Sequence, residues 1–153
     1  MYTQGSYRRI TEVNDEKEVV CSGRTLAPLL LGALFWFIGI GVISLILILD
    51  ISQEAIGTGI ILFLLCGMEG SYFLLFWYNK RITVTWDDLI YRSIWGKEKK
   101  YAWKDVKSVR YKSMGRGEYR ILIKTSQKIY IETGMMKNSE EAEKMIKEKG
   151  YLV

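Results

Sequence analysis

The sequence contains no histidine and only two cysteines among its 153 residues. Histidine is the commonest general base and metal ligand, so its absence removes the usual route to acid–base and metal chemistry. Cys21 and Cys66 lack zinc-site spacing, and the sequence has no P-loop, no Gly-x-Ser-x-Gly motif and no acid pair outside predicted turns. We therefore predict a protein that is not an enzyme, with no catalytic residue, no metal and no cofactor.

Charge is missing from residues 26–49, and residues 56–78 carry only one charged group, Glu69. Each run is longer than 20 residues. At about 1.5 Å of rise per residue, such a helix crosses a hydrocarbon core of about 30 Å. The rest of the chain is too short to bury two such helices, and the first run is too long for a signal peptide. We predict two transmembrane helices, 26–49 and 56–78.

The short connection between the two runs, residues 50–55, makes them an antiparallel hairpin with both ends on one side. This connection holds two acids and no Lys or Arg, whereas Arg24 precedes the first run and Lys80 and Arg81 follow the second. By the positive-inside rule, both termini are cytoplasmic. The two cysteines are then expected to be reduced thiols.

Outside the hairpin, residues 1–25 form a polar cytoplasmic segment, either a short helix or a pair of strands, and residues 79–153 form a separate soluble domain. Alternating apolar residues in this domain predict five or six antiparallel strands at hairpin spacing, with a glycine-containing turn at 114–118. The expected strands cover residues 81–86, 89–95, 119–125 and 128–133, with one bent strand or two short ones over 100–113.

A helix closes the domain. Asn138 is placed to cap it, with Glu141 three residues later as in a capping box, and Gly150 is placed to stop it. Ala142, Met145, Ile146 and Lys149 share one face of this helix. We expect that face to cover apolar sheet surface that would otherwise be open.

These features support a family resemblance. The stretch KRITVTWDDLIYRSIWGKEKKYAWKDVKSVR resembles the first half of bacterial PH-like (pleckstrin-homology-like) domains, most specifically over 87–93 and 103–109. The order of two transmembrane helices and then this domain is similar to small bacterial PH-domain membrane proteins. The resemblance, over about residues 27–152, implies an α-helical hairpin plus an α+β PH-like antiparallel sheet or partial barrel closed by the C-terminal helix. It also implies the bacterial cytoplasmic (inner) membrane, and the strand count stays open.

The domain is basic, with 18 Lys or Arg and 10 Asp or Glu over residues 79–153, a net charge of +8. A tethered basic domain reaches an anionic leaflet, where each close cation contributes about 1 kcal/mol. We therefore predict an anionic-lipid or partner surface; the alternative is an ordinary solvated face. The residues of this predicted surface are Lys97, Lys99, Lys100, Lys104, Lys107, Arg110, Lys112 and Arg116.

The sequence also bears on nucleic-acid, protein and homo-oligomer partners. Aromatic residues interleave with the basic ones, as on a nucleic-acid stacking surface, but such positions in strands are more often core or cross-strand pairs, so no nucleic acid is predicted. A protein partner adding a strand to a sheet edge, or lying beside the C-terminal helix, fits a module without catalytic residues. Gly32, Gly39, Gly67 and Gly70 indicate close helix packing, within the hairpin or in a homo-oligomer.

Glu69 is level with Trp36 if the two helices run side by side from their connection. A charged carboxylate at that depth costs at least about 2.5–3.5 kcal/mol, so we predict that Glu69 is protonated or paired, with the Trp36 indole as donor. This makes Glu69 a packing contact in the anchor. The sequence thus favours a membrane-anchored PH-like binding or scaffold module; the alternative is a subunit of a membrane transport or proton-linked complex that uses Glu69.

Overall fold

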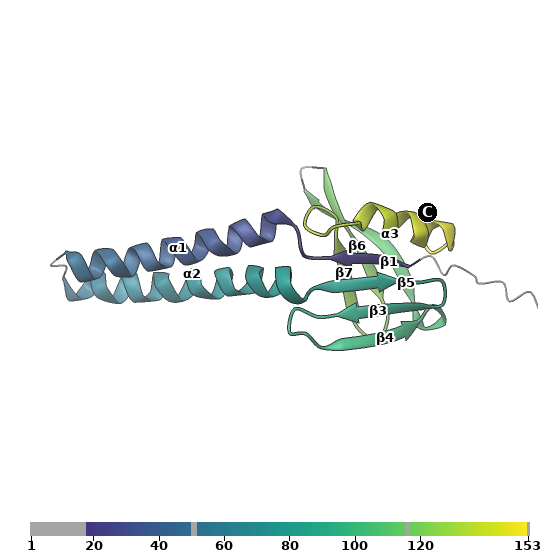
Figure 1. The fold of residues 1–153 in the computed structure, drawn as a ribbon, viewed down its shortest axis with the longest axis horizontal. Helices are drawn as coiled ribbons and strands as arrows, with labels where there is room; N and C mark the ends of the chain where they lie inside the picture. Colours follow the sequence, from purple (N-terminus) through teal and green to yellow (C-terminus); the bar gives the residue numbers. More distant parts are fainter. Residues whose placement is uncertain (1–17, 50–51, 116, 153) are drawn as a thin grey trace, which may run out of the picture.

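The computed structural model describes residues 18–49, 52–115 and 117–152. Its first large feature is an antiparallel pair of helices, α1 (Leu26–Ile48) and α2 (Gln53–Asn79), which extends away from the rest of the molecule (Figure 1). The predicted runs and the helices agree closely, although α2 begins three residues earlier than predicted. By length and composition both helices are able to cross a membrane.

The strands form two antiparallel sheets, of four and three strands, in sequence order. The stretch 100–113 gives two strands separated by a 3₁₀ turn, Trp103–Asp105. The first sheet contains β1 (Val19–Ser22), β2 (Arg81–Val84), β3 (Asp88–Arg92) and β4 (Glu98–Ala102). The second contains β5 (Ser108–Gly115), β6 (Glu118–Lys124) and β7 (Lys128–Glu132).

The first strand comes from the segment before the helices. β1 pairs antiparallel with β2, with Val19 opposite Val84 and Ser22 opposite Arg81. The Gly23 amide also donates to the Lys80 carbonyl at 2.9 Å. The sheet unit is therefore built from both sides of the hairpin, and adjacent strands lead into α1 and out of α2. The predicted boundaries after residue 25 and before residue 79 therefore separate β1 from β2, although these two strands pair in one sheet.

One apolar core fills the space between the two sheets and α3 (Ser139–Glu148). Ile82, Leu89, Ile121 and Ile131 are fully buried in it. The predicted apolar face of α3 is confirmed, since Ala142, Met145 and Ile146 are buried; the core also includes Cys21. Burial of this kind contributes about 25 cal/mol for each Å² of apolar surface removed from water.

The start of α3 differs from the predicted capping box. Asn138 is the N-cap residue, but its φ of 58° is left-handed and its side chain makes no cap hydrogen bond. The side-chain amide of Asn138 instead donates to the Val20 backbone carbonyl at 3.1 Å, and the Asn138 backbone carbonyl accepts from the Cys21 thiol at 3.3 Å. The residue therefore fastens α3 to β1, a contact that a local helix signal does not reveal.

Candidate functional site

An apolar groove of about 570 Å³ lies where the hairpin meets the sheet unit. Its walls come from one face of α2, from Trp36 on α1 and from the turn between β3 and β4. The Trp36 ring packs edge-on against Phe63, with centroids 6.3 Å apart. The residues that line the groove are Trp36, Phe63, Leu64, Gly67, Met68, Ser71, Tyr72, Leu75, Ile94 and Trp95.

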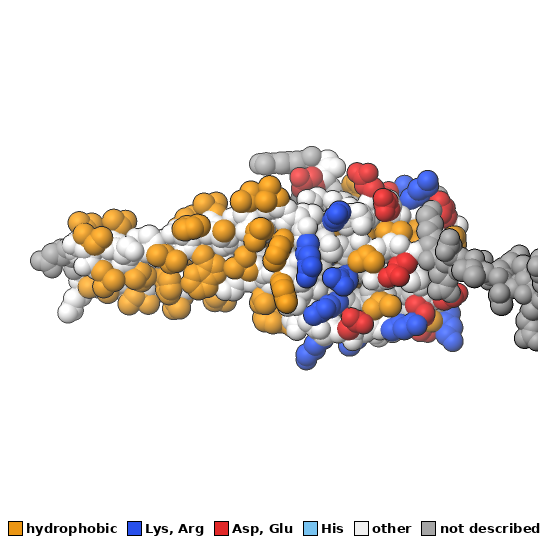
Figure 2. All heavy atoms as spheres, viewed as in Figure 1, with side chains coloured by type: hydrophobic (Ala, Val, Ile, Leu, Met, Phe, Trp, Pro, Cys, Tyr) orange, Lys and Arg blue, Asp and Glu red, His pale blue; other side chains and the backbone are white. Residues whose placement is uncertain are grey.

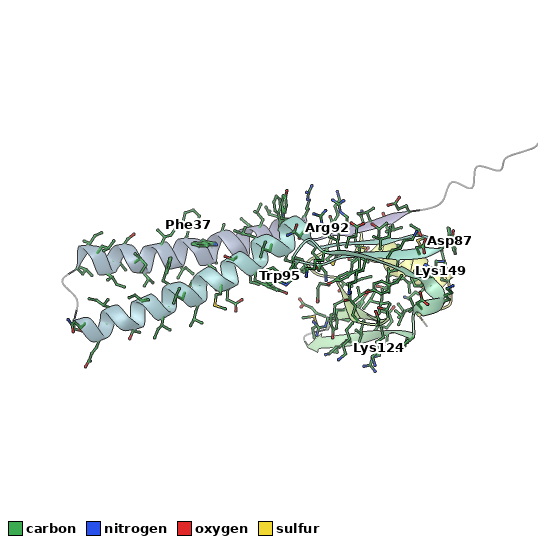
Figure 3. The ribbon with its side chains drawn as sticks, turned by 90° about the horizontal axis from the view of Figure 1, so that it is seen from below. Phe37, Asp87, Arg92, Trp95, Lys124 and Lys149 are labelled. Carbon is green, nitrogen blue, oxygen red and sulfur yellow. The ribbon has the colours of Figure 1, made fainter. Side chains whose placement is uncertain are left out.

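The β3–β4 turn is held against the end of α2 by polar contacts. The Asn79 side chain donates to the Ile94 carbonyl at 2.7 Å. Within the turn, the Ser93 amide donates to the Lys97 carbonyl at 2.8 Å, and Gly96 has a φ of 77°, which favours glycine. Trp95 at this turn is 71% exposed and lies beside the end of the helices (Figure 3). The turn is thus fixed in position while its indole remains uncovered.

Basic residues surround this end of the sheet unit. Arg81 begins β2, two residues after the end of α2, and the β2–β3 register places Arg92 opposite it. Lys80 is buried, with its ammonium 4.7 Å from the centre of the Tyr91 ring, and burial lowers the pKa of Lys80 to about 8. Figure 2 shows Lys and Arg side chains gathered between the apolar helices and the rest of the domain on the visible face.

Arg92 has an unmet hydrogen-bonding group. Among the described residues, its Nε is buried and has no hydrogen-bond partner. One terminal nitrogen of its guanidinium lies beside Gly96, and the Asn79 amide oxygen is close to the same glycine. Arg92 therefore lies at the β3–β4 turn, close to Gly96 and to the end of α2, although it is not one of the residues that line the groove. The sequence analysis did not single it out, since nothing local distinguishes it from the other basic residues.

The predicted basic surface divides between the two ends of the sheet unit. Lys97 belongs to the turn beside α2, and Lys99 lies opposite Tyr91 near that end. Lys100 is farther along β4 and forms an ion pair with Asp88 at 2.7 Å. Lys104 lies in the 3₁₀ turn after β4, next to Trp103, whose amide donates to the carbonyl of Asp87 at the end of the sheet unit opposite the helices (Figure 3); Lys107 follows this turn.

The remaining members of that surface belong to the second sheet. Arg110 and Lys112 are exposed on β5, the edge strand of the three-stranded sheet. Arg116 lies outside the described residues. The seven described residues therefore do not share one face; Lys97, on the turn, and Lys99, on β4, are the two that lie next to the helix end.

Glu69 is exposed on the surface of α2. Trp36 contacts the positions of Gly67 and Gly70, so it lies at the predicted level along α2. In the described part of the chain, however, Glu69 has no hydrogen-bond or ion-pair partner, and the predicted bond from the Trp36 indole is not observed. Around α2, Glu69 lies about 150° from the middle of the groove-lining stripe, at 100° per residue. Glu69 and the groove are separate features.

A second polar cluster joins α3 to the β5–β6 hairpin. The Glu143 carboxylate accepts from the Tyr111 and Tyr119 hydroxyls at 2.6 and 2.9 Å, and pairs with Lys147 at 2.8 Å. Burial raises the pKa of Glu143, but the bonds from Lys147 and the two tyrosines outweigh it, and the net shift is downward. Both tyrosine pKa values are raised, so neither hydroxyl is a ready acid. The cluster fastens elements together.

The sequence does not predict this cluster. Glu143 and Lys147 have the spacing of a helical ion pair, but Tyr111 and Tyr119 come from a distant part of the chain. Among the described residues, no three His, Cys, Asp or Glu side chains are grouped to hold a metal ion. Comparison of the chain with known protein families, curated proteins and solved structures gives no match. The features that indicate a function are therefore the apolar groove and the basic residues at the end of the sheet unit next to the helices.

Proposed function

We propose that this chain is an integral protein of the bacterial cytoplasmic membrane whose sheet unit is a PH-like binding module. The helices span the bilayer with both termini in the cytoplasm, and the end of the sheet unit next to the helices docks on anionic lipid. The opposite end and the β5 edge then face the cytoplasm, where a protein partner is recruited or regulated. The chain acts as a scaffold rather than as an enzyme.

One observation carries this proposal: adjacent strands, β1 and β2, lead directly into α1 and out of α2. Two backbone attachments fix the orientation of the sheet unit relative to the helices, as one flexible linker would not. Arg81, Arg92 and Lys97 then lie at the level of lipid headgroups if the helices span the membrane. Each cation near an anionic surface contributes about 1 kcal/mol, so the set provides a substantial attraction.

The arrangement of the elements supports the PH-like part of the proposal. The described residues form seven strands, in sheets of four and three, followed by a helix, and this is the strand number of a full PH barrel. The seventh strand is β1, which the sequence analysis did not count. In this interpretation the hairpin is an insertion between the first two strands of the domain.

Hydrogen exchange on the full chain in nanodiscs tests the docking. We expect the amides of the β3–β4 turn to exchange more slowly in phosphatidylglycerol nanodiscs than in phosphatidylcholine nanodiscs. The double variant K97Q/K99Q should lose most of this difference, because it removes two cations near the headgroups. The matched variant K104Q/K107Q, at the opposite end, should keep it. Equal exchange of the wild type in both lipids would contradict lipid docking.

The exposure of Glu69 favours a second candidate function. If α2 spans the membrane, this carboxyl faces either lipid or another helix, and an ionised acid facing lipid costs at least about 2.5–3.5 kcal/mol. A neighbouring subunit that covers Glu69 would form a proton-linked or transport complex. The variant E69Q decides between the two: in a scaffold, assembly and partner binding persist and no activity is lost, whereas in a conduit transport is lost while assembly persists.

A further inference from the structure

We propose that the groove between Trp36 and Trp95 binds one acyl chain of an anionic phospholipid from the cytoplasmic leaflet, with the headgroup phosphate on Arg92. This proposal rests on the membrane docking proposed above and names its ligand. It converts a general attraction for the leaflet into a defined lipid site that belongs to both the hairpin and the sheet unit.

The lining of the groove fits a hydrocarbon chain. Of its ten residues, only Ser71 and Tyr72 carry a hydroxyl group, and none carries a charge. An acyl chain needs no hydrogen-bond partner, whereas a peptide would leave backbone groups unsatisfied along such a wall. The apolar, uncharged lining therefore favours lipid over a polypeptide segment.

The direction and length of the groove also fit. The α2 residues that line it recur every three or four positions from Phe63 to Leu75, so they form one stripe along the helix. Twelve residues of helix span about 18 Å, close to half of a hydrocarbon core of about 30 Å. The groove thus runs parallel to the lipid chains, through the leaflet that borders the sheet unit.

The turn next to the groove fits an anionic headgroup. Ile94 and Trp95 on this turn line the groove, and the Arg92 guanidinium lies beside Gly96, the next residue along. The terminal nitrogen of Arg92 near Gly96 lies on the same turn as Ile94 and Trp95, so a headgroup phosphate at this level would accept a charge-assisted hydrogen bond from it. Lys97 is exposed on the same turn, and Glu98, opposite Arg92 in the β3–β4 register, is the nearby acid. Basic groups outnumber the acid at the headgroup level.

Native mass spectrometry of the full chain in mild detergent tests the site. The probes are a phosphatidylglycerol and a phosphatidylcholine with the same acyl chains. We expect the wild type to retain one phosphatidylglycerol and to bind phosphatidylcholine about fivefold less, since one close cation contributes about that factor. Equal retention of both lipids would overturn the headgroup assignment, and a lipid-free dimer that persists with phosphatidylglycerol present would overturn the lipid site.

The variant G67F fills the groove. A Cβ at Gly67 meets only Trp36, at 3.9 Å, so the added ring enters the groove without forcing the helices apart. We expect lipid retention to fall at least tenfold, because displacing about two methylene groups from apolar surface has that effect. The control G57F, where a Cβ meets nothing within 4 Å, should retain lipid normally. Unchanged retention by G67F would overturn the proposal.

The headgroup contact has its own pair of variants. R92Q should lower the preference for phosphatidylglycerol about fivefold, and K104Q, at the opposite end of the sheet unit, should leave it unchanged.

If G67F loses the lipid but the β3–β4 turn still exchanges more slowly in anionic nanodiscs, the groove and the general docking are separate and both stand. If G67F keeps the lipid while that difference persists, only the groove proposal fails. If the wild type shows neither lipid retention nor the exchange difference, docking itself fails.

Discussion

The hairpin and the sheet unit use the same apolar residue types in opposite ways. Ile48 is 78% exposed and Leu47 80% exposed on α1, whereas Ile82 and Ile121 are fully buried in the sheet unit. A soluble domain that left so many large apolar side chains uncovered would expose a patch well beyond the few hundred Å² usual for a monomer. The two regions therefore have surfaces suited to different solvents: that of the hairpin suits lipid and that of the sheet unit suits water.

The two regions also differ in what holds them together. In the hairpin the buried positions include Pro28, Gly32, Gly39, Gly59 and Gly70, so the helices approach through small residues. In the sheet unit, interlocking Ile, Val, Leu and Met side chains form the core. In lipid, burying an apolar side chain between helices gains little, because the surroundings are equally apolar. Helices there associate instead through close packing of their backbones at small residues. Variants matched across the two regions test this difference.

The largest effect is expected from one substitution made in both regions. I82A removes a fully buried side chain and should lower the free energy of unfolding of the sheet unit by about 2–5 kcal/mol. I48A removes a side chain that is 78% exposed and should change the stability of the protein in nanodiscs by less than about 0.5 kcal/mol. Denaturant titration in nanodiscs measures both. Similar losses would contradict the difference in packing.

A substitution at the closest approach of the helices comes next. A Cβ at Gly70 would lie 2.7 Å from Trp36 Cδ1 and 3.0 Å from the Gly32 carbonyl oxygen. G70V should therefore force the helices apart, at about 1–3 kcal/mol. Thermal unfolding in detergent, followed by tryptophan fluorescence, measures the loss. G57V adds the same methyl groups where nothing lies within 4 Å, and a loss equal to that of G70V would argue against a packing role.

The junction between the regions gives a pH-dependent prediction. Burial lowers the pKa of Lys80 from 10.5 to about 8, so between these values the unfolded chain binds more protons than the folded one. Stability should therefore rise with pH over that window, on the order of 3 kcal/mol in neutral detergent. K80M removes the buried charge; it should be more stable than the wild type at pH 7, and the difference should shrink by pH 10.5. Denaturant titrations at several pH values measure it.

The sequence predicts those parts of the fold that local patterns determine, and not those that depend on contacts between residues far apart in the chain. The uncharged runs define the helices, and alternation defines β2, β3, β6 and β7, because both are local patterns. The sequence does not decide the structure of β1, since its partner β2 lies about 60 residues away across the hairpin and nothing near Val19 indicates it. For the same reason the sequence predicts Trp95 as the end of a strand: its place beside α2 depends on the Asn79–Ile94 bond, which joins separate elements.

The smallest effect is expected within the sheet unit, at Glu143. Its pKa lies below the ordinary value because Lys147, Tyr111 and Tyr119 hold the carboxylate against the cost of burial. The stability it contributes is therefore present above about pH 4.5 and lost as the pH falls below it. E143Q should cost at most about 1 kcal/mol at pH 6, since the partners Lys147, Tyr111 and Tyr119 are exposed, and the gap to the wild type should narrow as the pH falls and Glu143 is protonated. Denaturant titration measures the gap, and E140Q, at an exposed position on the same helix, serves as the control. A gap that stays the same as the pH is lowered would mean that Glu143 holds α3 by packing, as the core does, and not by charge.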